Sequence, residues 1–347
     1  MRIAVWHNTP SGGARRAMYY HVRGLVARGH EVESWCPSTA DPSYLPLRLL
    51  APEHVVKFDS SLETRNGAIW RYVRAFRRMR EMDRVCKQAA QEIQDGGFDV
   101  LLANSCFYYA MPFIVRYLKM PKVVYLHEPF RRFYEAAPTL PWIGRTEEGG
   151  QSLATHARTF VADQLELQGI RIQARREWEN AHSCDAILVN SYFSRESILR
   201  AYGRTADVCY LGVDTALFCN QRRPRENFVA GLGSFLPAKG IDRAIRSVAK
   251  LAQPRPRLVW IGNGGVPGYD REMKRLADSC GVTFEARALV SDEELVGTLN
   301  RAALLVYTSR LEPFGFAPLE ANACGAPVVA VAEGGVRETV RDGLNGF

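Results

Sequence analysis

Short apolar runs that alternate with longer helical patterns constrain the fold of this chain more than any other feature. The first series of runs reads RIAVWH (2–7), EVESWC (31–36), HVVKF (54–58), FDVLLAN (98–104), PKVVYL (121–126), CDAILVN (184–190) and ADVCYL (206–211). A second series reads FVAGLG (228–233), RLVWIG (257–262), VTFEA (282–286), ALLVYTS (303–309) and PVVAVA (327–332). Strands that are separated by helices pair in parallel through right-handed crossovers. The pattern therefore predicts an α/β chain with parallel sheets.

Two such series predict two doubly wound domains, because a polar stretch, CNQRRPREN (219–227), interrupts the alternation. A chain of 347 residues also exceeds what a single core usually holds. We expect an N-terminal domain over residues 1–212, a linker over 213–227 and a C-terminal domain over 228–347. Ligands of doubly wound folds bind beyond the carboxyl ends of the strands, so we expect the two domains to face a cleft that holds the site.

Composition limits the partners and the compartment. The net charge of +8 suits anionic partners such as nucleotide phosphates or an anionic membrane surface, and no nucleic-acid-binding motif accompanies it, so we expect no nucleic-acid partner. The eight cysteines include no C-x-x-C pair, which argues against zinc, iron–sulfur clusters and a disulfide framework. The cysteines show no pairing pattern, the sequence opens with a strand-like stretch (MRIAVWHN), and it contains no run that could span a bilayer. These features predict a cytoplasmic protein. The inner face of the membrane stays open as its location.

The stretch LEPFGFAPLEANACGAPVV (311–329) concentrates the candidate chemistry. Glu312 follows a buried strand, Gly315 allows backbone to approach a ligand, and Pro318 suits the first turn of a helix. Glu320 then falls one turn into that helix, whose positive N-terminal end favours an anion such as a diphosphate. Two carboxylates beside an anion site make sense if each accepts hydrogen bonds from hydroxyl groups, one of a sugar and one of a ribose.

These residues resemble a known family. EPFGFAPLE, continued by ANACGAPVVA and EGGVRETVRDGLNGF, is similar to the E-x7-E signature of family-4 (group 1) retaining glycosyltransferases of the GT-B fold. Other segments match in order and spacing: GLGSFLPAKGIDRAI (231–245), IGNGG (261–265), SDEELVGTLNRAALLVYTSRLE (291–312), LGVDTALF (211–218), VNSYFSRESI (189–198), HEPFRRFYE (127–135) and SGGARRAMYYHVRGLVARGHEV (11–32). The resemblance covers the whole chain, more loosely from residue 40 to 120, and implies two Rossmann-like domains.

The resemblance also implies a role for each matching residue. Glu312 would contact the donor sugar and His127 would face it from the N-terminal domain, and these are the candidate catalytic residues. Lys239 would neutralise the leaving diphosphate, and Glu320 would bind the ribose. The other expected donor-binding residues are Phe314, Gly315 and Phe316 through their N–H groups, Val290 at the base, Ser234, and Gly12 and Gly13 in the first loop.

Each of these residues also has a structural interpretation. Glu312 and Glu320 could be solvated charges, and Lys239 a surface lysine. His127 could be a histidine at a strand end, and the pair Gly12–Gly13 could cap the helix that follows. HEPFRR could likewise be a solvated turn instead of an acceptor loop.

Two features depart from the family pattern. Ser234 stands where the family usually has an arginine, five residues before Lys239, and serine is a poor substitute for a bidentate phosphate binder. Family members also continue with further helices beyond the segment GLNGF, whereas this sequence ends at Phe347. The resemblance therefore implies a fragment whose C-terminal domain is incomplete, with apolar side chains such as Val336 and Leu344 exposed, weak donor binding and slow turnover.

A long helical pattern from Ile69 to Ile93 needs separate interpretation. Apolar residues recur every three positions and predict a stripe that faces the core: Trp70, Val73, Phe76, Met79 and Met82. Arginines occupy the other faces: Arg71, Arg74, Arg77, Arg78 and Arg84. We interpret them as a solvated basic face, and docking on an anionic membrane that carries a lipid-linked acceptor stays open.

The resemblance implies a retaining hexosyltransferase that moves a sugar from a nucleotide-sugar donor to a hydroxyl acceptor, a glycan or a lipid-linked saccharide, in polysaccharide biosynthesis. No D-x-D motif occurs, so we expect neither a metal nor another cofactor, and Lys239 with the helix end would carry the diphosphate charge. The alternative is a catalytically impaired nucleotide-sugar-binding or scaffold protein of the same fold. A dinucleotide-dependent oxidoreductase is disfavoured, because GLGSFL and GNGGVP lack the third glycine of the required motif.

Overall fold

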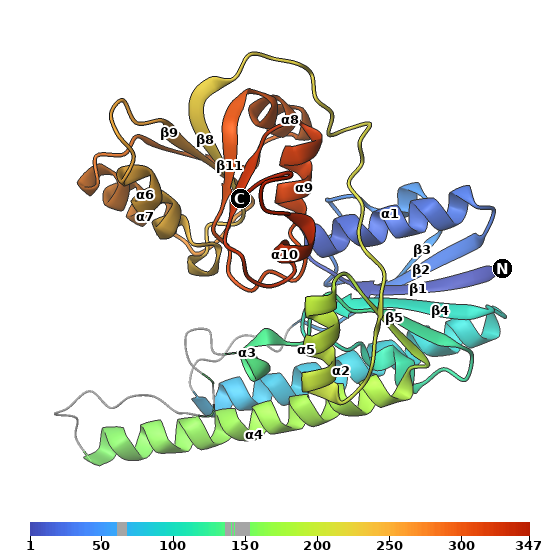
Figure 1. The fold of residues 1–347 in the computed structure, drawn as a ribbon. Coiled ribbons are helices and arrows are strands. Elements are labelled where there is room, and N and C mark those ends of the chain that lie inside the picture. The colour runs from blue at the N-terminus through green and yellow to red at the C-terminus, as the bar shows by residue number, and fades with distance from the viewer. Residues whose placement is uncertain (61–67, 136–139, 141, 143–152) are drawn as a thin grey trace. The chain divides into compact units, whose positions relative to one another are not determined.

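The chain divides into two compact units in its computed structural model (Figure 1). The structure describes residues 1–60, 68–135, 140, 142 and 153–347. Unit 1 comprises residues 1–190 and 195–209, and unit 2 comprises residues 191–194 and 210–347. Within the described part of the chain, no helix is both long enough and apolar enough to cross a lipid bilayer.

Unit 1 is built on a parallel seven-stranded sheet with the strand order β3-β2-β1-β4-β5-β6-β7. Its strands are β1 (Arg2–Asn8), β2 (Glu31–Pro37), β3 (Glu53–Val56), β4 (Val100–Cys106), β5 (Lys122–Tyr125), β6 (Ala186–Val189) and β7 (Asp207–Val208). Its helices are α1 (Gly13–Ala27), α2 (Ala68–Asp95), α3 (Arg131–Tyr134), α4 (Leu153–Ser183) and α5 (Tyr192–Tyr202), which begins within residues 191–194 of unit 2. Single 3-10 turns occupy Leu47–Leu49 and Phe113–Arg116.

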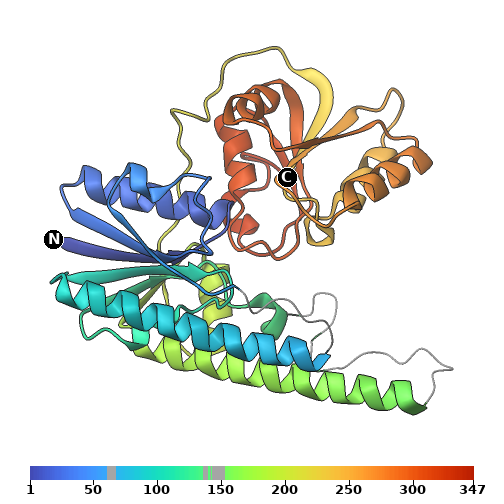
Figure 2. The same ribbon diagram turned by 180° about the vertical axis from the view of Figure 1, so that it is seen from behind.

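Both faces of the unit 1 sheet are covered, because successive side chains of a strand point to opposite sides. In β1, Ile3 and Val5 join the cluster that α1 packs, whereas Ala4 and Trp6 join the cluster that α2 and α4 pack. Figures 1 and 2 show α1 along one face of this sheet and α2 beside α4 along the other. The near-continuous apolar runs of the sequence are thus strands buried on both faces.

Unit 2 is built on a parallel five-stranded sheet with the strand order β10-β9-β8-β11-β12. Its strands are β8 (Glu226–Leu232), β9 (Arg257–Gly262), β10 (Phe284–Ala288), β11 (Ala302–Tyr307) and β12 (Val328–Ala330). Its helices are α6 (Ile241–Ala249), α7 (Tyr269–Ser279), α8 (Asp292–Arg301), α9 (Phe316–Ala323) and α10 (Val336–Thr339), with a 3-10 turn at Pro237–Lys239.

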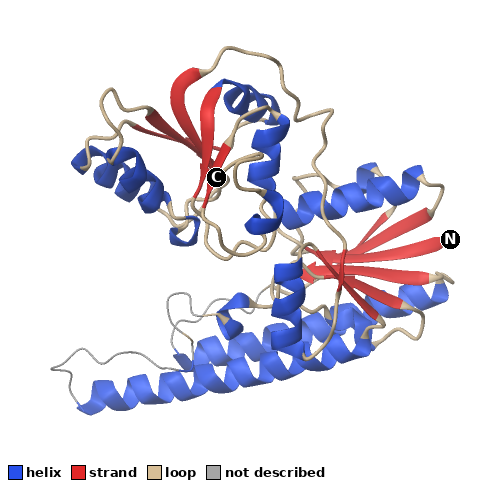
Figure 3. Cartoon of the chain, in the orientation of Figure 1, coloured by secondary structure: helices blue, strands red, loops and turns tan. Residues whose placement is uncertain are grey.

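The unit 2 sheet is also covered on both faces, as Figure 3 shows. Val229 of β8 lies in the cluster packed by α6 and α7, whereas Phe228 and Ala230 lie in the cluster packed by α8 and α9. Both sheets therefore have the doubly wound arrangement that the sequence predicts, with their loops at the carboxyl edge available for ligands.

Two expectations about burial are wrong. The stripe on α2 is not a core stripe along its whole length, because Phe76 is 42% exposed whereas Met82 is 1% exposed. The helix reaches the core cluster only near Met79, and the side chain of Arg71 lies outside the described residues. Val336 is 1% exposed because it packs into the cluster of α8 and α9, although Leu344 is 74% exposed as expected.

Candidate functional site

The loops that follow β8 and β11 lie at the same edge of the unit 2 sheet, because these strands are parallel neighbours. The first loop contains the single 3-10 turn Pro237–Lys239, and the second runs from Thr308 to the start of α9. Thr308 ties the loops together, since its Oγ1 hydroxyl lies 3.0 Å from the carbonyl oxygen of Lys239 and 2.8 Å from that of Gly240. The two loops therefore form one structural element at the carboxyl edge.

Lys239 and Glu312 form the central ion pair of this element. The ammonium group of Lys239 donates to Oε2 of Glu312 at 2.8 Å, and both side chains are about four-fifths buried, with 24% and 19% exposed. Ser309 Oγ donates to the same carboxylate oxygen at 2.5 Å. Burial raises the pKa of Tyr307 well above its usual value, and the negative charge of Glu312 and a hydrogen bond with it raise this pKa further. Glu312 is thus held from several directions.

The backbone at Glu312 is fixed by a pair of glycines from the loop after β12. The N–H of Gly335 donates to the carbonyl oxygen of Glu312 at 2.8 Å. A Cβ at Gly334, which has a φ of 64°, would lie 2.5 Å from that oxygen, and a Cβ at Gly335 would lie 2.0 Å from the carbonyl oxygen of Pro313. Only glycine allows this close approach of the two loops.

Helix α9 begins at Phe316 directly after the Glu312 loop, and Gly315 is its N-cap with a φ of 88°. The first N–H groups of a helix lack acceptors inside the helix, and the helix dipole adds positive charge there. Pro318 lies in the first turn, where its missing N–H costs nothing. This end of α9 can therefore receive an anion beside Lys239.

The other predicted residues of unit 2 are placed as follows. Phe314 is 4% exposed, and its ring lies 5.7 Å from the ring of Phe316. Glu320, on α9, is only 3% exposed. Ser234 is half-buried in the loop after β8, and Val290 is half-buried directly before α8, where it packs against the cluster of α8 and α9.

Arg243 is a cation that could replace the family arginine absent at Ser234. Its Nε and Nη2 atoms would lie 2.7 Å from a Cβ at Gly240, so the guanidinium packs directly on the residue after Lys239. Its Nε is buried, and no hydrogen-bond partner is recorded for it among the described residues. The side chain therefore adds positive charge next to the Lys239 turn. Arg243 lies on α6, four residues beyond Lys239.

Three polar residues, Tyr307, Thr308 and Ser309, were not assigned to the site from the sequence. They end the apolar run ALLVYTS, and Ser309 lies three positions before Glu312. Polar residues at the carboxyl end of a buried parallel strand lie where ligands bind, so their position was the available signal.

The structure places His127, Gly12 and Gly13 in unit 1. His127 follows β5, its Nδ1 lies 3.5 Å from Nδ2 of Asn190, and burial, with a smaller effect of His21, lowers its pKa to about 3. The imidazole is therefore neutral near pH 7. Gly12 is the N-cap of α1 with a φ of 135°, and Gly13 is the first residue of that helix.

A cluster of potential metal ligands also lies in unit 1: His7, Cys36 and Glu53, whose ligand atoms lie within 4.8 Å of one another. Arg15 already supplies the positive charge there. Its Nη1 donates to Nδ1 of His7 at 2.9 Å, and Nε2 of His7 lies 3.2 Å from Oε1 of Glu53. Burial lowers the pKa of His7, and the hydrogen bond from His7 lowers the pKa of Glu53. The arrangement is a buried ion pair relayed by a neutral histidine.

Comparison with known families shows to which protein family the chain belongs. Residues 11–217, more than half of the sequence, match the model described as Glycosyltransferase Family 4. The chain belongs to this family. In this family 4 member, residues 214–347 also match the model of Glycosyl transferases group 1. The two matches together span residues 11–347.

Curated relatives of this family 4 chain include D-inositol 3-phosphate glycosyltransferases. The one from Mycobacterium sp. (strain KMS) is 32% identical over 190 residues, which cover 50% of the chain and 43% of the relative. The one from Mycobacterium leprae (strain Br4923) is 37% identical over 164 residues, covering 43% of the chain and 38% of the relative. The chain thus matches less than half the length of these relatives.

Solved structures share the fold of the family 4 chain. Anabaena HepE in complex with UDP has a TM-score of 0.71 at 20% identity, covering 100% of the chain and 85% of that protein. Sucrose-phosphate synthase from Thermosynechococcus elongatus has a TM-score of 0.69 at 18% identity, with the same coverage of 100% and 85%. The two parallel sheets and these neighbours identify the two-domain, Rossmann-like GT-B fold.

Proposed function

We propose that the chain transfers a sugar from a nucleotide-sugar donor to a hydroxyl acceptor with retention of the anomeric configuration. The ion pair of Lys239 and Glu312 carries the proposal, because it sets a cation and a carboxylate side by side at the carboxyl edge of the sheet. Doubly wound folds bind their ligands at this edge. Membership of Glycosyltransferase Family 4 and the UDP bound to Anabaena HepE support it.

The chemistry of the site follows from its charges. Transfer breaks the bond between the sugar C1 and the diphosphate, so negative charge develops on the leaving diphosphate. Lys239, Arg243 and the N-terminal end of α9 are positioned to stabilise that charge, and the donor therefore needs no metal in this proposal. Glu312 accepts hydrogen bonds from the sugar hydroxyls and offsets positive charge at C1.

The remaining predicted residues complete the proposed site. Glu320 binds the ribose, Val290 lines the base pocket, and Ser234 with the N–H groups of residues 314–316 contacts the phosphates and sugar. The family resemblance assigns His127 and the pair Gly12–Gly13, all in unit 1, to the donor sugar. A neutral His127 suits a hydrogen bond with a hydroxyl better than a charge interaction, because burial holds its pKa near 3.

We also propose that the protein works in the cytoplasm at the inner face of a membrane. On α4, Phe160 is 65% exposed and Val161 is 49% exposed, and Phe76 on α2 is 42% exposed. Arg77 and Arg80 are exposed beside Phe76. Apolar side chains among arginines are typical of surfaces that bind anionic bilayers. Co-sedimentation with anionic but not neutral vesicles, lost in Phe160→Ser, tests this location.

The activity is tested with a panel of UDP-, GDP- and ADP-linked hexoses. We expect release of nucleoside diphosphate from one donor, loss of release in Lys239→Met and Glu312→Ala, and an α-linked product from an α-linked donor by NMR. A product of inverted configuration would contradict retention. Nucleotide-sugar binding without any release would instead support a catalytically impaired binding protein.

A further inference from the structure

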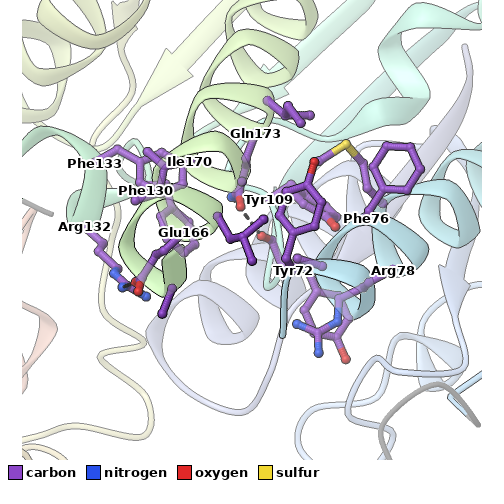
Figure 4. Close-up of a pocket in the computed structure, with 17 residues that line it drawn as sticks. Tyr72, Phe76, Arg78, Tyr109, Phe130, Arg132, Phe133, Glu166, Ile170 and Gln173 are labelled. Atoms are coloured by element: carbon purple, nitrogen blue, oxygen red, sulfur yellow. Dashed lines mark hydrogen bonds and ion pairs between the residues drawn. The ribbon is translucent and has the colours of Figure 1, made fainter. Parts of the chain in front are cut away.

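A pocket of about 380 Å³ lies within unit 1, bordered by α2, α4 and the segments that follow β4 and β5 (Figure 4). Its walls are mainly aromatic and aliphatic, and include Phe76, Met79, Tyr109, Phe130, Leu165 and Ile170. Its size falls within the range of small-molecule sites, roughly 300–1,000 Å³. None of the residues assigned to the donor lines this pocket. We therefore look for a ligand other than the donor.

Three polar side chains of the pocket wall, Gln173, Glu166 and Arg132, already have partners. Gln173 donates through Nε2 to the carbonyl oxygen of Tyr108 at 3.2 Å and to Oε1 of Glu177 at 2.8 Å. Glu166 forms an ion pair with Arg132. A saccharide in this pocket would leave most of its hydroxyls without partners, which is unfavourable when they are removed from water. The walls therefore select an apolar ligand.

Two arginines line the same pocket and add a preference for negative charge. The guanidinium of Arg78 lies 4.7 Å from the centre of the Tyr108 ring, and the side chain of Arg132 is 63% exposed. A guanidinium has five N–H donors, so Arg132 can bind a phosphate while it retains Glu166. The ligand that fits both features is an apolar group that ends in an anion.

The apolar surface continues from the pocket to the outside of α4. Ala162 lines the pocket, and the two residues before it, Phe160 and Val161, are exposed. Phe76 both lines the pocket and is 42% exposed. A hydrocarbon chain that leaves a bilayer would meet this surface first, whereas a freely soluble aromatic compound would not need it. The observations therefore favour a lipid chain.

Gly169 keeps the space between the two long helices open. It lies in the interior of α4, where glycine costs about 1 kcal/mol relative to alanine. A Cβ at this position would point toward α2, 3.9 Å from Cδ2 of Tyr72. A larger side chain there would extend into the pocket, which both residues line.

We propose that this pocket binds the hydrocarbon chain of a lipid-linked saccharide acceptor, whose saccharide supplies the hydroxyl group, with the lipid phosphate at Arg78. This inference rests on the proposed sugar transfer, because it names the class of acceptor for that reaction. Its physical content is independent: the pocket binds an isoprenyl or alkyl phosphate in the absence of any donor.

The test is calorimetric binding of geranyl phosphate to the whole chain without nucleotide. The pocket variant is Gly169→Leu, and its matched control is Gln168→Leu on the exposed neighbour. Leucine favours a helix over glycine, so the pocket variant should keep its melting temperature. We expect at least tenfold weaker binding in Gly169→Leu and unchanged binding in Gln168→Leu. Arg78→Gln should weaken the binding of geranyl phosphate but leave the weaker binding of geraniol unchanged.

Three results would overturn the proposal. Equal binding to wild type and Gly169→Leu would place the ligand elsewhere. Equal affinity for inorganic phosphate and geranyl phosphate would show that the hydrocarbon chain of the ligand does not contribute to binding. Tighter binding of 4-nitrophenyl phosphate would indicate an aromatic ligand. Release of nucleoside diphosphate from a nucleotide sugar, measured on the same preparation, separates failure of this proposal from failure of the proposed function.

Discussion

Lys239 Nζ lies 2.8 Å from Oε2 of Glu312, although the two residues are 73 positions apart in the sequence. Ser309 shares the same oxygen as its acceptor. A diphosphate that binds Lys239 must therefore compete with a carboxylate for the ammonium group. Glu312 restrains the cation and positions it for the leaving group, so the two residues have to be tested as a pair.

Glu312→Ala should lower turnover by a hundredfold or more while nucleoside diphosphate binds at least as tightly as in the wild type. The reason is that the variant loses contacts to the sugar and releases Lys239 from its partner. Glu320→Ala should instead weaken the binding of the nucleotide itself, and Glu320→Gln controls for the loss of a buried carboxylate. Steady-state kinetics and calorimetry measure the two effects, and the opposite ranking would exchange the two roles.

Transfer should survive a chelator, because charge neutralisation is assigned to Lys239, Arg243 and backbone N–H groups. The measurement compares the initial rate before and after EDTA treatment and after addition of manganese or magnesium. We expect the three rates to agree within experimental error. Loss of transfer with EDTA and recovery with either metal would contradict the assignment.

Ser234→Arg should tighten nucleoside diphosphate binding by roughly tenfold or more, since a charge-assisted hydrogen bond contributes about 1.5–3 kcal/mol. Arg243→Gln should weaken binding, because its guanidinium adds positive charge next to the Lys239 turn. Arg246→Gln, which changes an exposed arginine on the same helix, is the matched control. If Ser234→Arg gives no gain while Arg243→Gln gives a loss, Arg243 already fills the role of the missing arginine.

The stability of unit 1 should fall as the pH rises toward neutrality, because burial raises the pKa of Glu177 from 4.5 to about 7. The folded state then binds the proton more tightly than the unfolded state, so the stabilisation is complete below pH 4.5 and is lost as the pH passes 7. The loss should be on the order of 3 kcal/mol, at about 1.4 kcal/mol per pKa unit.

Glu177→Gln should remove this pH dependence, because glutamine does not titrate. Its Oε1 can accept from Gln173, and its Nε2 can donate to the hydroxyl oxygen of Tyr202. Thermal unfolding between pH 4 and 8 measures the difference. Glu179→Gln, two residues along α4 at a less buried position, is the control and should behave as the wild type does. Parallel pH profiles for wild type and Glu177→Gln would show that Glu177 ionises normally.

The elements that could be predicted are those whose signal is local. Buried parallel strands read as apolar runs whatever their neighbours, and the Glu312 loop with the start of α9 lies within one continuous stretch, 311–329. The run 206–211 was longer than β7, which covers Asp207–Val208, because a strand at the edge of a sheet has one partner to define its length.

The features that could not be predicted depend on distant segments. The contact of Lys239 with Glu312 needs the crossover between β8 and β11, and spacing alone does not give it. The exposed Phe76 fits a core stripe by periodicity, but the helix extends beyond the core at that point. The pocket of unit 1 combines residues from four separate segments, of which one, HEPFRRFYE (127–135), matches a family segment.

The close contact of Gly334 and Gly335 with the Glu312 loop has a consequence for mutational tolerance. Any side chain at either position would collide with backbone atoms of Glu312 or Pro313. In a complete substitution scan, these two positions should therefore be as intolerant as Glu312, although neither has a side chain that could touch a sugar. Directed evolution aimed at a new donor sugar should leave both glycines fixed and vary the loop they support.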